Sequence, residues 1–150
     1  METTQFTHPH PVWKDLADHI LVAIDDDESG ITHEHLWAKR VDENLYELCC
    51  VPAIVRQMAL GDVVRANANF DVQEVVRPSG RFVFRAYSEV TWAEKQEVIV
   101  KLRALGALVE PCSINLLAID AKDVATAKRT RKYLVSCEDE GLLVYETGWN

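Results

Sequence analysis

The sequence lacks the signals that would insert the chain in a membrane or export it. No apolar run approaches the roughly 20 residues that a membrane-spanning helix needs. The N-terminal stretch METTQFTHPHPVWKD has neither the basic start nor the apolar centre of a signal peptide. We therefore expect a cytoplasmic protein that makes no contact with a membrane.

The motifs of common catalytic and cofactor sites are also missing. The chain has no GxGxxG fingerprint, no P-loop and no GxSxG elbow, and its four cysteines contain no CxxC pair. Cys49 and Cys50 are adjacent, so in a strand they point to opposite faces and cannot pair with each other. We expect free, buried thiols, and the sequence predicts neither a cofactor nor a catalytic residue.

Two stretches resemble metal-ligand sets without completing one. Residues 25–30 (DDDESG) copy the first half of an EF-hand loop, but the twelfth position of that loop, where calcium needs a glutamate, is Leu36. Histidines recur at alternate positions in 8–10 and again in 33–35. Zinc takes three or four protein ligands, and nothing in the sequence brings the two histidine pairs together. The sequence therefore predicts no metal site.

Negative charge is in excess and is concentrated in the N-terminal half. The formal net charge is −8, and residues 1–75 hold 14 acidic and only 5 basic side chains. An acidic surface repels nucleic acid and attracts basic partners. RNA-binding sheets also stack bases on aromatic residues of their central strands, and the strand-like run 114–121 has no aromatic residue. We expect a protein partner rather than a nucleic acid.

Residues 18–80 contain short strand-like runs separated by turns. The runs are at 19–24, 36–41, 45–51, 63–70 and 72–76, with a turn at 78–80. The pattern predicts a small antiparallel β-barrel-like lobe. Residues 52–59 fit either a short helix or a loop. Two prolines in HPHP make residues 1–17 an extended N-terminal tail.

A Gly-Asp pair, Gly61-Asp62, precedes the predicted strand that starts at residue 63. The pair could either bind a ligand or bend the chain. Gly61 permits a sharp turn or a positive φ before the strand. Asp62 accepts hydrogen bonds from nearby backbone N–H groups. No other polar groups converge on the pair, so we expect an architectural role.

The hydrophobic period changes to that of a helix in the C-terminal part, residues 81–150. Thr91 followed by Glu94 is a capping box, and Gly106 ends the same helix. Asp123 starts a second helix that ends at Gly141. Strands are expected at 81–88, 107–111, 114–121 and 142–148. The order βαββαβ predicts a ferredoxin-like lobe after the β lobe, in an α+β protein.

Several short motifs carry a resemblance to a known family. They are LWA (36–38), YEL (46–48), VP (51–52), LGDVVRA (60–66), VV (75–76), SG (79–80), LRALGALVE (102–110) and LLAIDA (116–121). In this order and spacing the chain resembles the bacterial domain of unknown function family 4265, over residues 19–148. The resemblance implies a small bacterial protein, and by analogy such proteins include immunity factors that neutralise toxins.

These observations together favour a non-enzymatic binding protein. We expect an immunity-type inhibitor that covers a basic toxin or toxin domain with an acidic surface, acting as a monomer or homodimer. The predicted partner-binding residues are Asp25, Asp26, Asp27, Glu28 and Glu34, with Glu43 at the rim. One alternative is a regulatory or small-molecule-sensing domain that pairs its sheets in a dimer. Another is an enzyme with its site between the two lobes.

Overall fold

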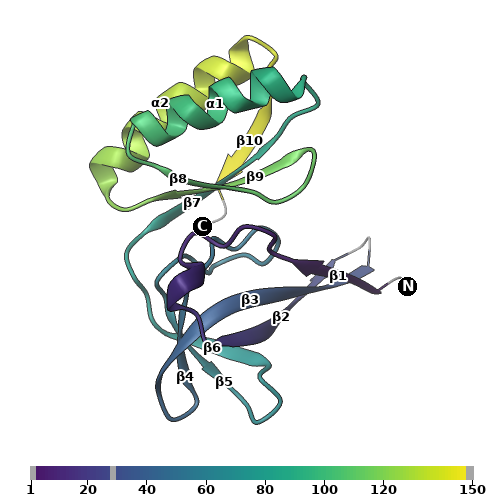
Figure 1. Cartoon of the computed structure of the whole chain (residues 1–150), viewed down its shortest axis with the longest axis vertical. Helices are drawn as coiled ribbons and strands as arrows, with labels where there is room; N and C mark the ends of the chain where they lie inside the picture. Colours follow the sequence, from purple (N-terminus) through teal and green to yellow (C-terminus); the bar gives the residue numbers. More distant parts are fainter. Residues whose placement is uncertain (1–2, 28–29, 148–150) are drawn as a thin grey trace.

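A computed structural model of the chain describes residues 3–27 and 30–147. These residues form two sheets and two α-helices, which confirms the α+β class. The helices cover one face of the smaller sheet, and the larger sheet lies beyond its other face, so the molecule has three layers (Figure 1). Neither helix is long and apolar enough to cross a membrane in the part of the chain described.

The N-terminal lobe is a six-stranded sheet built around one long strand. Its elements are β1 (Thr3–Thr7), the 3-10 helix η1 (Lys14–Leu16), β2 (His19–Asp27), β3 (Gly30–Asp42), β4 (Leu45–Leu48), β5 (Val63–Ala66) and β6 (Val72–Arg77). Strand β3 pairs with β2 along one edge, and with β1 and then β4 along the other. All pairs are antiparallel except β1 with β3.

This sheet curls but does not close into a barrel. The β2 strand meets the chain before β6 in a single bridge, Val22 to Asp71, where the Val22 N–H donates to the Phe70 carbonyl at 2.9 Å. The curled sheet encloses a core of alternating inward residues that includes Leu21, Leu36 and Leu48. The predicted barrel-like lobe is therefore an open, curled sheet.

Residues 3–7 are part of this sheet, and so the predicted tail is wrong for them. Thr3–Thr7 is a strand that pairs in parallel with β3. His8 is 1% exposed, and the Trp13 N–H donates to the Cys49 carbonyl at 3.0 Å. The two prolines of HPHP do limit the strand, because β1 ends before them. The backbone hydrogen bond of Trp13 nevertheless holds the segment beyond them to the chain directly after β4.

The C-terminal lobe has the predicted ferredoxin-like order. Its elements are β7 (Phe82–Tyr87), α1 (Trp92–Ala104), β8 (Leu108–Pro111), β9 (Leu116–Ala121), α2 (Val124–Asp139) and β10 (Val144–Thr147). The strands lie in the order β10-β7-β9-β8, and all neighbours are antiparallel. The predicted caps are present: Thr91 accepts from the Glu94 N–H at 3.3 Å, and Asp123 accepts from the Thr126 N–H at 2.8 Å.

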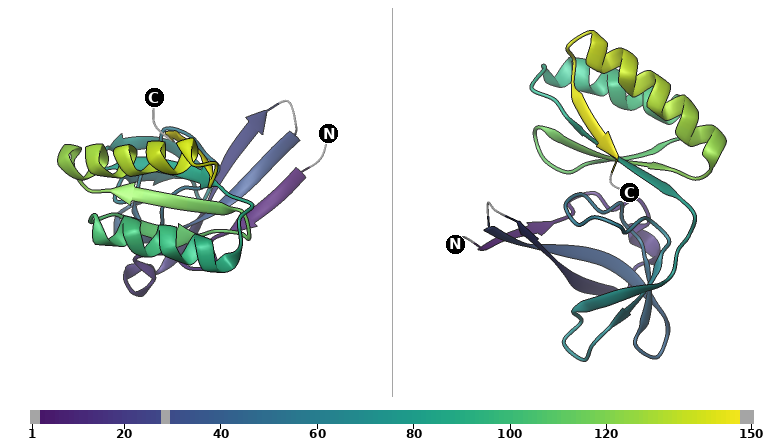
Figure 2. Two further views of the ribbon diagram at one scale, coloured as in Figure 1. Left: turned by 90° about the horizontal axis from the view of Figure 1, so that it is seen from above. Right: turned by 180° about the vertical axis from the view of Figure 1, so that it is seen from behind.

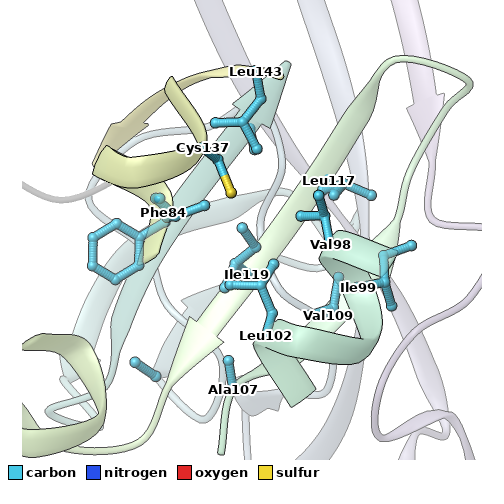
Figure 3. Packing of buried hydrophobic residues seen from close by; sticks show 13 residues of the cluster. Phe84, Val98, Ile99, Leu102, Ala107, Val109, Leu117, Ile119, Cys137 and Leu143 are labelled. Carbon is cyan, nitrogen blue, oxygen red and sulfur yellow. The ribbon is translucent and has the colours of Figure 1, made fainter. Parts of the chain in front are cut away.

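The two faces of the second sheet have different neighbours. Figure 3 shows Phe84 and Ile119 on the face that packs against the helices, together with Leu102 of α1 and Cys137 of α2. The opposite face carries Val83, Leu116 and Ala118, which pack on the N-terminal lobe. In that lobe the contacting residues are Val51, Ala53, Ala59 and Leu60. The central strands β7 and β9 are therefore buried on both sides over most of their length, whereas the edge strand β10 is partly exposed.

Gly61 and Asp62 have the architectural role expected from the sequence. Gly61 has a φ of +82°, a conformation that favours glycine. The buried Asp62 carboxylate accepts from the Ala59 N–H at 2.9 Å and from the Ser79 N–H at 2.7 Å. One carboxylate therefore fixes the bend before β5 and the chain after β6.

Replacing Asp62 by alanine should lower the free energy of unfolding by about 2–3 kcal/mol, because the buried N–H of Ala59 and the N–H of Ser79 both lose their acceptor. Urea unfolding followed by circular dichroism measures the change. Replacing the exposed Asp139 by alanine is the control, with an expected change within about 0.5 kcal/mol. A loss below about 0.5 kcal/mol for Asp62→Ala would contradict this role.

Candidate functional site

Three of the predicted partner-binding residues, Asp25, Asp26 and Asp27, lie on a projecting arm. We use this name for β1, residues 24–27 of β2 and residues 30–33 of β3, which extend beyond the rest of the N-terminal lobe (Figure 1 and Figure 2). Asp25 and Asp26 pair with β3, so they belong to a strand and not to the predicted turn. Asp25 is half-buried and Asp26 is exposed. Since side chains alternate along a strand, the two carboxylates flank β2 on opposite faces.

The structure does not bring all the predicted residues to this arm. Asp27 is the last residue of β2 and belongs to the arm, whereas Glu28 lies outside the described residues. Glu43 is exposed in the turn after β3, which is 13 residues long, about 40 Å of strand. Glu43 is therefore at the opposite end of β3 and does not form a rim around the arm.

The prediction that Glu34 binds a partner is wrong, because this side chain is buried. Glu34 is 0% exposed. It lies on the inward face of β3, the same face as the core residues Leu36 and Ala38. Its carboxylate accepts hydrogen bonds from the N–H groups of Ala53 at 2.7 Å, Ile54 at 3.0 Å and Val55 at 2.8 Å.

Glu34 belongs instead to a buried cluster between the two lobes. His8 Nε2 lies 2.5 Å from Glu34 Oε2, and His8 Nδ1 lies 2.8 Å from Glu110 Oε1. Glu34 comes from β3 and Glu110 from β8, so one imidazole connects the two sheets. His8 is 1% exposed, and both carboxylates are 0% exposed.

The loop at 51–55 holds both carboxylates. Glu110 Oε2 accepts from the Val51 N–H at 2.6 Å, and the next amides of the loop are those that donate to Glu34. Residues 52–59 form a loop and not the alternative short helix. The loop at 51–55, the segment after β1 and both lobes thus meet at this buried cluster.

The charges in this cluster stabilise one another. Burial by itself would lower the pKa of His8, but Cys50, Cys112 and Glu110 oppose this effect and raise the pKa well above its usual range. Burial would raise the pKa of Glu34, but the hydrogen bond and charge of His8 and the amides of Ala53 and Val55 lower it overall. His8 is therefore an imidazolium between two carboxylates at neutral pH.

Two thiols lie against His8 and complete the cluster. Burial raises the pKa of Cys50 to about 11 and also raises the pKa of Cys112, so both stay protonated and are weak nucleophiles at neutral pH. Cys112 Sγ donates to the Glu110 carbonyl at 3.4 Å. His8, Glu110 and Cys112 each offer one metal-ligand atom, and these atoms lie within 4.8 Å of one another.

The sequence contained only weak signals for this cluster. His8 falls in a stretch that its prolines assign to a tail, and its partners are 26 and 102 residues away. Glu34 had one signal, since it shares the period-two inward face of Leu36 and Ala38. Glu110 is a single carboxylate in an otherwise apolar strand, which is a signal of a buried, paired charge.

Comparisons with known proteins identify relatives of the chain and of its fold. A family model described as "Domain of unknown function (DUF4265)" matches residues 34–145. No curated protein matches the chain. A structure titled "Novel crystal structure of a hypothetical protein from Neisseria gonorrhoeae" is similar, with a TM-score of 0.73 at 14% identity over 87% of this chain and 93% of that chain. At this identity the likeness concerns the fold alone.

Proposed function

The chain belongs to the DUF4265 family, and for this member we propose a non-enzymatic role in protein binding. The proposed activity is that of a cytoplasmic immunity-type inhibitor, which neutralises a basic bacterial toxin through the arm. The observation that supports it is the combination, on β2, of two carboxylates with an unpaired backbone edge.

The outer edge of β2 has backbone groups free to pair with another strand. The Val22 N–H points away from β3, because it donates to Phe70. Backbone groups alternate in direction along an antiparallel strand, so those of Ile24 and Asp26 also point away from β3. In the described part of the arm, β2 has β3 as its only strand neighbour. A partner strand could therefore add to this edge.

The side chains around this edge suit a strand that is both apolar and basic. Ile20 is 47% exposed and Ile24 is 59% exposed, and both lie on the same face as Asp26. Asp25 lies on the opposite face. The described residues of the arm include no lysine or arginine. A partner strand with exposed apolar residues and flanking Lys or Arg side chains would bury the isoleucines and meet a carboxylate on either face.

A toxin that acts on nucleic acids has the surface required of such a partner. Enzymes of this kind bind phosphates with Lys and Arg, and carboxylates on an inhibitor replace the phosphates. Complementary charge also accelerates association, which matters when an inhibitor must capture a toxin before it acts. The proposal therefore names a basic, nucleic-acid-directed enzyme as the partner class.

Reversing both charges of the arm should weaken binding of the partner by about 10–100-fold, since each carboxylate then repels the surface that it attracted. The full chain, immobilised, captures proteins from lysate of its source organism. The captured protein is then purified and titrated against the wild type and the variant Asp25→Lys/Asp26→Lys. The wild-type affinity should also fall steeply with salt.

The matched control reverses two exposed carboxylates of the helical layer, Glu97→Lys/Asp139→Lys. This variant has the same net charge as the arm variant, so a general effect of charge would weaken both equally. The proposal requires the control to bind within about twofold of the wild type. Equal weakening of the two variants, or an affinity indifferent to salt, would overturn it.

A further inference from the structure

The buried cluster contains a set of metal ligands that protein binding through the arm does not use. We propose that His8, Glu110 and Cys112 form a structural zinc site, with the thiol of Cys50 as the fourth ligand. The zinc site does not depend on the proposed function, since its ligands are buried between the lobes, whereas the carboxylates and the backbone edge proposed to bind a partner belong to β2, which supplies no ligand. The zinc ion holds the lobes together and takes no part in chemistry. Its binding displaces the proton on Nδ1 of His8 and the proton of each ligating thiol, because zinc binds neutral imidazole and thiolate.

The donor atoms are those that zinc prefers. Imidazole nitrogen, thiolate sulfur and carboxylate oxygen are its usual ligands, and mixed sets with four protein ligands are structural. The ligand atoms of His8, Glu110 and Cys112 lie within 4.8 Å of one another. Tetrahedral zinc places its ligand atoms about 3.3–3.8 Å apart. The Cys112 sulfur therefore needs to approach by at most about 1 Å, while His8 Nδ1 and Glu110 Oε1, which are 2.8 Å apart, need to separate by about 0.5 Å.

A second thiol, that of Cys50, lies beside His8 but outside the group of atoms within 4.8 Å of one another, so it must move inward to become the fourth ligand. Cys50 lies against His8, and its environment also contains Glu110 and Glu34. Cys50 and Cys112 are 0% and 5% exposed, so water does not compete for the fourth position. Closed, fully protein-ligated sites of this kind are typical of structural zinc and not of catalytic zinc.

The hydrogen bonds around the cluster direct the ligand atoms inward. Glu34 holds His8 by its Nε2 and is itself fixed by three backbone N–H groups, so the Nδ1 of His8 faces Glu110. A carboxylate on the far nitrogen of a histidine is the usual outer contact of a zinc ligand. The Val51 N–H anchors Glu110 Oε2, which leaves Oε1 directed at His8.

Metal analysis of the full chain tests the proposal. The protein is produced in zinc-supplemented medium, purified without chelator and measured by inductively coupled plasma mass spectrometry. We expect about one zinc per chain. Removing it with a chelator should lower the melting temperature, and adding zinc chloride alone should restore it. Cobalt in place of zinc should produce a thiolate-to-cobalt charge-transfer absorption.

Two serine variants separate a metal site from ordinary burial of a thiol. Cys112→Ser should lower the zinc content at least about tenfold and abolish the cobalt absorption. Cys137→Ser changes an equally buried thiol in the helix-covered core and should leave both unchanged. Zinc-free wild-type protein that zinc does not stabilise would overturn the proposal, and so would full zinc content in Cys112→Ser. The wild-type measurements decide the matter even if a variant does not fold.

Discussion

Replacing Glu34 by alanine is expected to lower the free energy of unfolding by about 3–5 kcal/mol. The side chain is fully buried and accepts hydrogen bonds from His8 and from three backbone amides. Its removal leaves a buried imidazolium with one carboxylate in place of two, and leaves the three N–H groups without an acceptor. Urea unfolding at neutral pH, followed by circular dichroism, measures the loss.

The control for this change is Glu43→Ala, a glutamate exposed in the turn at the other end of β3. Its expected effect is within about 0.5 kcal/mol. Glu34→Gln should fall between the two variants, since glutamine keeps a carbonyl acceptor but places an NH₂ group against N–H donors. If the free energy of unfolding of Glu34→Ala is within about 1 kcal/mol of the wild-type value, the cluster does not hold the lobes together.

Replacing Arg81 by alanine is also expected to lower the free energy of unfolding by about 3–5 kcal/mol at neutral pH. Arg81 makes a bidentate pair with Asp120, from Nε to Oδ1 at 2.9 Å and from Nη2 to Oδ2 at 2.6 Å. Its guanidinium also lies over the Trp13 ring, 5.2 Å from the centroid, and so connects the second sheet to the first segment of the chain. Without it, the fully buried Asp120 has no cation partner.

The loss of unfolding free energy in Arg81→Ala should depend on pH, because Arg81 influences the protonation of Asp120. Burial raises the pKa of Asp120, and Arg81 opposes that effect. Removing Arg81 therefore raises this pKa further, so the folded variant takes up a proton at a higher pH than the unfolded chain does. The deficit should be largest at neutral pH and should shrink as pH falls toward the raised pKa.

Urea unfolding at pH 7 and pH 5 measures this pH dependence, and the double variant Arg81→Ala/Asp120→Ala is the control. The double variant has no buried carboxylate at this position, so its stability relative to the wild type should lack this pH dependence. An equal deficit of Arg81→Ala at both pH values would contradict the assignment to Asp120.

Local signals explain why the ferredoxin-like lobe could be predicted so closely. Its two helices have caps at Thr91 and Asp123, and each cap is satisfied by the residue three positions later. Its strands are apolar runs bounded by turn residues. Since each element is specified by neighbours in sequence, the order βαββαβ followed from the chain alone.

The buried cluster of His8, Glu34 and Glu110 could not be predicted, because its members are not neighbours in the sequence. They are brought together by tertiary structure, since His8 and Glu110 are 102 positions apart in the sequence. A carboxylate in sequence looks the same whether it faces solvent, as Asp26 does, or backbone amides, as Glu34 does. The period-two face that Glu34 shares with Leu36 was the one local observation that favoured burial.

The most direct test of the proposed function is amide hydrogen exchange of the chain, free and bound to the purified basic partner. Addition of a strand to β2 predicts new protection of the Ile24 and Asp26 amides, whose N–H groups point away from β3. Amides in the turn at Glu43, at the other end of β3, should exchange equally in both states. Protection confined to α1 or α2, with Ile24 and Asp26 unchanged, would show that the partner binds elsewhere and would contradict the role of the arm.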